Sequence, residues 1–418
     1  MKKHRGLNKD YWLYWAASSL GMGASNILQY VLSLYVLDIT GSATLFASML
    51  SIIIFPRILL TPLAGVLADR VKKIRVMSLI LLGEAVILGL YFLLGQAVTI
   101  GVALVYLLVV VLEAGEIFYG GCSAAILPEL VLADRIEDAI SISKVDDGIV
   151  QVTAPMIAAL LYDNFAIATV FAVIGALNLL SFLLQCAIRP KYETVPAADV
   201  RKNSVWRDFK DGIDCIWRNA FLRSFIVVLP VADAFFGATF SVSVAYLLRQ
   251  TYAVDTWVYS LYCSITSSMS MVVPLFAVPL VRKHPPRNVF FLATASIAVE
   301  IFLIGICAIC GMYQVLPVTG AVVLITILDC MTVAAAIPMQ MTSAIMLQTS
   351  VDKGILGRVS ATIRMVGIAG VAAGEMLFGL LNDATWVWLP IFLGALGVGA
   401  ASLLFRKTMP AQEHTAGG

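Results

Sequence analysis

The chain has 418 residues, of which 60% are hydrophobic and 13% are charged, and its formal net charge is +2. A soluble domain has about 25% charged and 45–50% apolar residues, so this composition excludes a soluble globular protein and predicts a membrane protein. The small net charge gives no reason to expect a nucleic acid partner. The position of each charge along the chain is therefore more informative than the total.

Runs of about 20 apolar residues, the length that a helix needs to cross a bilayer, occur twelve times along the sequence. In chain order we expect spans at 11–37, 44–68, 77–95, 98–121, 141–161, 166–188, 225–248, 258–281, 288–311, 316–346, 360–381 and 386–405. The predicted fold is all-α, with twelve transmembrane helices in two pseudo-symmetric six-helix bundles, a division typical of secondary transporters. We expect an N-terminal bundle over 1–188, a cytoplasmic linker with an amphipathic helix over 189–224, and a C-terminal bundle with a short cytoplasmic tail over 225–418.

The basic residues predict the orientation of these spans. If the N-terminus lies in the cytoplasm and each span crosses once, all but two of the 28 Lys and Arg residues fall on the cytoplasmic side. The exceptions are Arg57, within the second span, and Arg249, at an outer end. Because cytoplasmic loops carry an excess of Lys and Arg, this asymmetry supports the topology and places both termini in the cytoplasm.

Among the ionisable residues inside predicted spans, where each costs at least about 2.5–3.5 kcal/mol unless it faces a cavity or a partner, we single out seven. They are Arg57, Glu113, Glu116, Asp233, Glu300, Asp329 and Glu375. Glu113 and Glu116 are three residues apart and share one helix face, so either both face a cavity or both pack against neighbouring helices. Burial and a nearby carboxylate make a carboxyl group easier to protonate, which would suit a proton site.

The chain lacks the features of a membrane enzyme. It has neither an HExxH sequence nor the GxxxxGK[ST] phosphate-binding loop, and its three histidines lie in predicted tails or loops. Cys307 and Cys310 form a CxxC inside a span, where helix packing is a better interpretation than redox or metal chemistry. We therefore expect no enzyme activity, no cofactor and no metal. A receptor or scaffold without transport activity remains an alternative, although it would not explain the intramembrane carboxylates.

Four loop segments carry a family resemblance. The segment GVLADRVKKIR (65–75) resembles the loop signature of the major facilitator superfamily between its second and third helices. Three others resemble the branch of that family that contains macrolide-efflux and siderophore (enterobactin) exporters: LDITGSA (37–43), AAILPELVLADRIEDAISI (124–142) and GILGRVSATIR (354–364). The resemblance implies the major facilitator fold and transport by alternating access.

In that superfamily helices 1, 4, 7 and 10 are central, which implies cavity positions for Glu113, Glu116, Asp233 and Asp329 and more peripheral positions for Glu84 and Glu300. The segment EIFYGGCSAA, which begins at Glu116, is similar to the family's helix 4 signature but has Glu where arginine is usual. Glu113 or Glu116 could instead neutralise Arg57 across the second and fourth spans.

The resemblance also implies a cytoplasmic latch. In the family the loop acid, here Asp69, packs against the start of helix 11, where helix N-termini carry partial positive charge. We expect Gly65, Asp69, Arg70 and Arg358 to form this latch. The alternative is that these bases only fix the topology.

These observations predict a proton-coupled antiporter that exports amphipathic drugs or natural products, macrolide-like or cationic. The segment VTAPMIAA (152–159) resembles a weakened antiporter signature around Pro155. The alternatives are a lipid or lysophospholipid flippase and a siderophore exporter. The expected partners are protons, an amphipathic small molecule and the bilayer of a bacterial cytoplasmic (inner) membrane, in which we expect a monomer.

Overall fold

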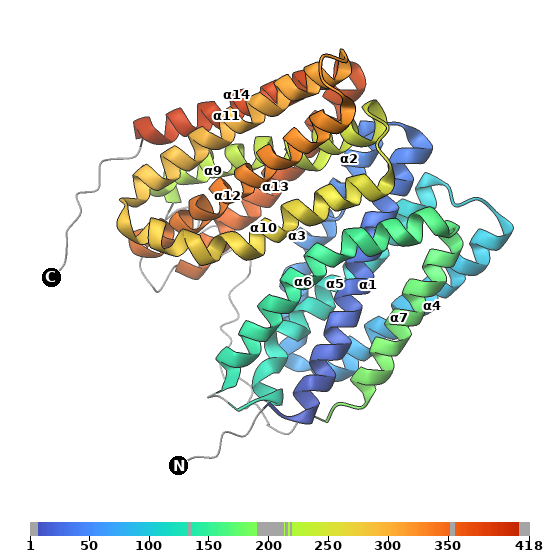
Figure 1. Ribbon diagram of the computed structural model, residues 1–418. Helices are drawn as coiled ribbons and strands as arrows, with labels where there is room; N and C mark the ends of the chain where they lie inside the picture. The colour runs from blue at the N-terminus through green and yellow to red at the C-terminus, as the bar shows by residue number, and fades with distance from the viewer. Residues whose placement is uncertain are drawn as a thin grey trace. The chain divides into compact units, whose positions relative to one another are not determined.

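The fold is helical throughout the described residues. The computed structural model describes residues 7–132, 135–189, 213, 216, 217, 220–351 and 356–408, and it places no strand among them. Twelve helical segments in these ranges are long and apolar enough to cross a membrane (Figure 1). The prediction of an all-α protein with twelve spans is therefore confirmed.

The first half of the chain supplies seven helices and the second half the rest. The former are α1 (Lys9–Thr40), α2 (Ala43–Ile52), α3 (Ile54–Arg70), α4 (Lys73–Ala97), α5 (Val102–Leu130), α6 (Ile136–Asn164) and α7 (Ile167–Cys186). The latter are α9 (Ala220–Ala238), the π-helices η2 (Thr239–Val244) and η3 (Leu247–Thr251), α10 (Thr256–Lys283), α11 (Pro286–Met312), α12 (Val318–Ser350), α13 (Leu356–Ala384) and α14 (Trp388–Thr408). The second expected span is thus two helices, α2 and α3, which meet at Ile53.

The chain divides into two compact units that do not follow sequence order. Unit 1 contains Met1–Val36 and Ile52–Lys202, and unit 2 contains Leu37–Ser51 and Asn203–Gly418. The end of α1 and the whole turn into α2 therefore pack with the second unit. Most of the predicted linker, 189–224, lies outside the described residues, and the expected three-part division of the chain remains a prediction.

The turn between α1 and α2 follows directly from its sequence, TGSA. Gly41 has a φ of 62°, a backbone conformation that glycine adopts without steric cost. Its N–H donates to the Leu37 carbonyl oxygen at 2.8 Å, which ends α1. The hydroxyl of Ser42 then accepts from the Leu45 N–H at 3.2 Å and caps the start of α2. A short turn thus reverses the chain at the end of the first span.

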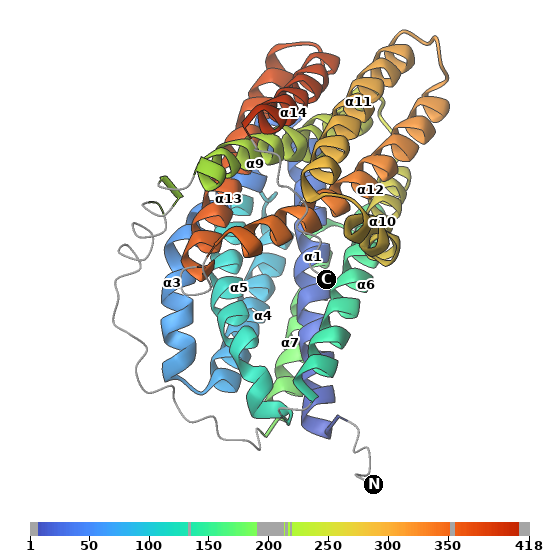
Figure 2. The same cartoon turned by 90° about the vertical axis from the view of Figure 1, so that its left-hand side faces the viewer.

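In unit 1, α4 packs along α7 and α3 packs along α5 (Figure 2). One end of the unit gathers the start of α1, the end of α5 and the start of α6. There the Tyr11 hydroxyl donates to the Ala139 carbonyl oxygen at 3.0 Å, and the Asn8 side chain donates to the Leu130 carbonyl oxygen at 2.7 Å. We call this end of the unit, which includes the first residue of α1, the Lys9 end.

Unit 2 repeats the helix pairing of unit 1. Helix α11 packs along α14, as α4 packs along α7 six spans earlier, and α10 packs along α12, as α3 packs along α5. Helix α9 packs against α13 and α14, and α11 also lies side by side with α12. Buried aromatic side chains contribute to this core, including Phe290 and Phe405, whose rings stack with centroids 3.9 Å apart.

The seventh span changes its helix type part-way. After α9 the chain continues through η2 and η3, two segments with the wider i to i+5 hydrogen bonding. Such π-helical turns are rare and occur frequently at functional sites. In this chain they carry Ser241, Ser243, Arg249 and Gln250, four polar side chains that all contact other segments of unit 2.

Candidate functional site

The first pair of predicted site residues meets in unit 1. Nε of Arg57 on α3 lies 2.5 Å from Oε1 of Glu113 on α5. The Glu113 side chain is 11% exposed and that of Arg57 is 52% exposed. Of the two possible partners that the sequence left for Arg57, the structure selects Glu113. An ion pair removes the net charge of both groups from the apolar part of the unit.

Glu116 lies one helical turn further along α5 and has a different environment. The hydroxyl of Ser25 on α1 hydrogen-bonds its carboxylate. The Arg57–Glu113 pair lies close enough to interact electrostatically with it, as does the carboxyl group of Glu84. Glu116 therefore lies between an ion pair and a second acid.

That second acid, Glu84 on α4, is only 8% exposed. Its Oε2 accepts a hydrogen bond from Nδ2 of Asn178 on α7 at 3.1 Å. Its Oε1 lies against Gly115 of α5, only 2.9 Å from the position that a Cβ atom would occupy there. Helix order in the family implies a peripheral position for Glu84, and within unit 1 its side chain is buried close to Glu116.

The predicted acids of unit 2 have separate neighbours. Oδ2 of Asp329 on α12 accepts a hydrogen bond from the Tyr262 hydroxyl on α10 at 2.7 Å, and both side chains are buried. Asp233 on α9 faces Gly367 of α13, with its Oδ2 3.9 Å from the position of a Cβ there. Glu300 on α11 hydrogen-bonds Thr332 on α12 through its carboxylate. The structure thus places Asp233, Glu300 and Asp329 on three different helices with different partners.

An apolar groove of about 510 Å³ lies between α10 and α12. Its walls are almost entirely hydrocarbon and thioether, and they include the ring of Tyr262, which also bonds Asp329. The lining residues are Val258, Leu261, Tyr262, Ile265, Met269, Val322, Val323, Thr326, Ile327, Cys330, Met331 and Ala334. Sequence reasoning did not predict this groove, because it depends on how two distant helices pack.

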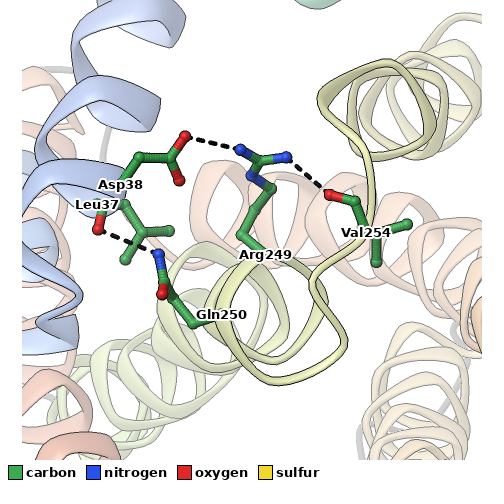
Figure 3. A network of polar contacts seen from close by, with 5 residues as sticks. All are labelled: Leu37, Asp38, Arg249, Gln250 and Val254. Carbon is green, nitrogen blue, oxygen red and sulfur yellow. Dashed lines mark hydrogen bonds and ion pairs between the residues drawn. The ribbon is translucent and has the colours of Figure 1, made fainter.

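A polar network joins the end of α1 to η3 (Figure 3). Nη2 of Arg249 lies 2.7 Å from Oδ2 of Asp38, and Nη1 donates to the Val254 carbonyl oxygen at 2.7 Å. The side-chain amide of Gln250 donates to the Leu37 carbonyl oxygen at 3.1 Å. Every residue of this network belongs to unit 2. The Asp38–Arg249 pair was not predicted, although Arg249 was the one base expected on the outer side of the membrane.

The same end of unit 2 contains a second acid, Asp383 near the end of α13. Its carboxylate accepts hydrogen bonds from the Ser42 hydroxyl at 2.6 Å, from the Ala43 N–H at 2.7 Å and from the Thr44 N–H at 2.9 Å. It therefore caps the N-terminus of α2, where free N–H groups and partial positive charge favour a carboxylate.

Two further contacts fix the π-helical part of the seventh span. Glu375 on α13 accepts from the Ser51 hydroxyl at 3.1 Å and from the Ser241 hydroxyl at 3.0 Å, so it connects α2 with η2. Tyr252 follows η3, and burial raises the pKa of its hydroxyl to about 12. It therefore stays protonated and donates to the carbonyl oxygens of Cys307 and Ala308 on α11.

The predicted cytoplasmic latch lies outside what the structure describes in atomic detail. Gly65, Asp69 and Arg70 belong to the last turns of α3, and Arg358 to the first turn of α13. Their side chains are outside the described residues. The latch remains a prediction.

Comparison with known proteins agrees with this architecture. A family model described as Major Facilitator Superfamily matches residues 14–375. The Macrolide efflux protein A of Streptococcus pyogenes is 25% identical over 177 residues, which are 41% of this chain and 43% of that protein. The match therefore spans less than half the length of that curated relative.

Solved structures share the fold at low sequence identity. A bacterial homologue of the iron transporter ferroportin in its inward-facing state has a TM-score of 0.74 at 15% identity, covering 97% of this chain and 99% of the other. The nucleoside transporter NupG has a TM-score of 0.72 at 13% identity, covering 95% and 98%. The resemblance predicted from the loop segments, to a transporter family and to a macrolide-efflux protein, is confirmed. The chain belongs to the Major Facilitator Superfamily, and its described residues include twelve helices that are long and apolar enough to cross a membrane.

Proposed function

We propose that this transporter exports amphipathic small molecules, macrolide-like or cationic, in exchange for protons by alternating access. The observation that carries the proposal is the set of buried and half-buried carboxyl groups that face hydroxyl and amide groups rather than bases. Glu84 faces Asn178, Glu116 faces Ser25, and Asp329 faces Tyr262. A carboxylate without a basic partner in an apolar environment is costly, and binding a proton or a cationic substrate relieves that cost.

The acids have different roles in this proposal. Glu116 and Asp329 are the leading proton or cation sites, and Asp233 is a further one. Glu113 and Arg57 neutralise each other, so we assign them a structural role that leaves no net charge from the pair near Glu116. A proton that moves down a membrane potential of 100 mV releases about 2.3 kcal/mol, so one proton per cycle can drive a more than tenfold gradient of an uncharged substrate.

The groove between α10 and α12 supports the choice of substrate class. Its volume of about 510 Å³ lies within the usual range of about 300–1,000 Å³ for small-molecule sites. Its hydrocarbon walls suit an apolar body, and the lining residue Tyr262 is hydrogen-bonded to the buried acid Asp329. An amphipathic cation would match both features. The partial similarity to a macrolide efflux protein supports export as the direction.

We place the protein in the cytoplasmic (inner) membrane of a bacterium as a monomer with both termini inside. The distribution of Lys and Arg supports this orientation. In this orientation the Lys9 end of unit 1 faces the cytoplasm. The Asp38–Arg249 pair and Asp383 face the outer side of the membrane.

Accumulation assays in efflux-deficient bacteria test the proposal. Cells expressing the protein are given a macrolide, a cationic dye, a siderophore or a lysophospholipid, with and without a protonophore. We expect lower accumulation of the macrolide or the dye, restored by the protonophore. Glu116→Gln and Asp329→Asn should remove the effect, whereas Glu137→Gln, at an exposed acid of α6, should leave it unchanged.

Two results would contradict the proposal. Lysophospholipid redistribution that ignores the protonophore, with no effect on drugs, would favour a lipid flippase. Export of the siderophore alone would favour the siderophore-exporter alternative. Expression of each variant is checked by membrane fractionation, so that a loss of transport is not confused with a loss of protein.

A further inference from the structure

One face of α7 carries three polar side chains in an otherwise apolar helix. Asn178, Ser181 and Gln185 are spaced by three and four residues, so they lie on the same side of the helix. Their exposed fractions are 4%, 0% and 0%. Seven residues of helix rise by about 10 Å, so this face extends from the middle of α7 toward its end at Cys186. That end lies at the Lys9 end of unit 1, where the Arg189 N–H donates to Asp10.

Most of the polar atoms on this face have no hydrogen-bond partner among the described residues. They are Oδ1 of Asn178, Oγ of Ser181, and both Nε2 and Oε1 of Gln185. Each buried atom of this kind costs about 1–3 kcal/mol when it is left unpaired. Lipid tails offer no hydrogen bonds, and native proteins pair nearly all such atoms with protein or with ordered water. Four of them along one stripe indicate a hydrated path.

The surrounding helices add further polar groups along this face. Gly21 of α1 packs against it, since a Cβ atom at Gly21 would lie 3.9 Å from Ser181 Oγ and 3.3 Å from Leu81 Cδ2. The Tyr119 hydroxyl on α5 is close enough to interact with the Gln185 amide, although the geometry falls short of a full hydrogen bond, and it donates to the Ser18 hydroxyl at 3.4 Å.

Two more hydroxyl groups continue the path toward the Lys9 end. The Tyr14 hydroxyl on α1 bonds Ser123 on α5 at 2.7 Å, close to the first turn of α1. A line of hydroxyl and amide groups thus runs from Asn178 to that end of the unit.

The other end of the path is an acid. Asn178 donates to Glu84, and the charge that faces Glu84 from α5 is Glu116. The groups that face Glu116 in turn are Ser25, Glu113 and Arg57. Of these only Arg57 is basic, and Glu113 already neutralises it. Two carboxyl groups that both lack a base and interact with each other are favourably placed to hold one proton between them.

We propose that the polar face of α7 lines a chain of ordered water molecules, and that Glu84 uses it to exchange a proton with the Lys9 end of unit 1 and to share that proton with Glu116. This inference rests on the proposed proton coupling and extends it, because it names a second acid and a route. One proton enters the chain from solution at the Lys9 end, and each water molecule that passes a proton on receives one from its neighbour and so ends unchanged. The carboxylate of Glu84 takes up the proton and passes it to the carboxylate of Glu116.

X-ray radiolysis of the purified full-length protein, followed by mass spectrometry, tests the water chain without any transport assay. Hydroxyl radicals formed from bound water oxidise the side chains next to it. We expect oxidation of Leu81 on α4, which is 3% exposed and lies beside Gly21 and Ser181. We expect no oxidation of Leu88 on the same helix α4, which is 0% exposed and packs against Gly175 of α7. Gln185→Leu should lower the oxidation of Leu81. If Leu81 is as unreactive as Leu88, the water chain is wrong.

Charge displacement on solid-supported membranes tests the role of Glu84. A step to lower pH at the Lys9 side of reconstituted protein should move charge in the wild type, with no substrate added. Glu84→Gln should abolish this signal, Gln185→Leu should slow it, and Glu137→Gln should leave it unchanged. Glutamine can still accept the hydrogen bond from Asn178, so Glu84→Gln is expected to fold, which thermal unfolding checks.

The two measurements separate this inference from the proposed function. If the wild type gives no charge displacement, proton coupling itself fails, and radiolysis still decides whether the water chain exists. If the wild type responds and Glu84→Gln responds equally with the same pH dependence, proton coupling stands and the assignment of Glu84 is wrong.

Discussion

Arg249 on η3 and Asp38 at the end of α1 are 211 residues apart in sequence and form an ion pair of 2.7 Å in unit 2. The Arg249 side chain is 10% exposed and that of Asp38 is 27% exposed. Because the same guanidinium also donates to the Val254 carbonyl oxygen, it joins three segments: the end of α1, η3 and the turn before α10.

Removing one partner of this pair should destabilise the protein. Asp38→Asn leaves a mostly buried guanidinium with a weaker acceptor, and Arg249→Leu leaves the carboxylate without its base. Because charge-assisted hydrogen bonds contribute about 1.5–3 kcal/mol, we expect each single variant to lower the unfolding midpoint by several degrees in detergent. The double variant should lose less than the sum of the two, which a double-mutant cycle of thermal unfolding measures. Strictly additive losses would mean that the two residues act independently.

Asp383 should protect the start of α2 from local opening. Asp383→Ala removes the acceptor for the Ala43 and Thr44 amides, and loss of such a cap costs about 0.5–2 kcal/mol. Hydrogen exchange of these amides should therefore be faster by roughly the corresponding factor, about 2- to 30-fold. Thr385→Ala serves as the control, since the Thr385 hydroxyl only bonds back to the Leu381 carbonyl oxygen. Unchanged exchange at Ala43 and Thr44 in Asp383→Ala would show that the cap is dispensable.

Substitutions at the two acids of α5, Glu113 and Glu116, should have different effects on folding and on transport. Glu113→Gln leaves Arg57 without its partner inside a span, so we expect less folded protein in the membrane. The double variant Arg57→Gln, Glu113→Gln should restore that yield, since no unpaired charge remains. Glu116→Gln, in contrast, should give normal amounts of protein with drug export that no longer responds to the proton gradient. Size-exclusion profiles and accumulation assays distinguish the two. A well-folded Glu113→Gln protein without transport would overturn the structural role of the pair.

Filling the groove should block substrate without unfolding the protein. Ile327→Trp places a large ring in the groove between α10 and α12, whereas Leu324→Trp puts the same ring at an exposed neighbour that does not line it. We expect Ile327→Trp to weaken binding of a fluorescent lipophilic cation by about tenfold or more, the equivalent of about 1.4 kcal/mol, and Leu324→Trp to leave it nearly unchanged. Fluorescence anisotropy on purified protein measures both. Equal binding by the two variants would mean that the cation occupies another site.

The twelve spans could be predicted because hydropathy over about 20 residues is a local property of the sequence. The break of the second span at Ile53 was not predicted, since it is flanked on both sides by isoleucine residues and hydropathy shows no interruption there. The Arg57–Glu113 pair could be predicted as one of two alternatives, because an intramembrane base needs an acidic partner and only a few acids lie in the neighbouring spans.

The other contacts depend on tertiary packing that hydropathy does not encode. One feature of the sequence could have indicated the Asp38–Arg249 pair: Arg249 was the single base expected on the outer side of the membrane. Glu84 was set aside because helix order alone made it peripheral, yet Asn178, Ser181 and Gln185 recur at helical spacing in an apolar span. A search for polar residues at that spacing would have pointed to α7. No comparable pattern in the sequence indicated the groove between α10 and α12.

The assignment of Leu37–Ser51 to unit 2 has a consequence for recombination between related transporters. A chimera joined at the central linker would take Asp38 from one parent and its ion-pair partner Arg249 from the other. It would likewise take the start of α2 from one parent and its capping residue Asp383 from the other. Such a hybrid inherits mismatched partners although each half is intact. An exchange that moves Leu37–Ser51 together with the second half keeps these partners from one parent, so the functional boundary for grafting is discontinuous along the gene.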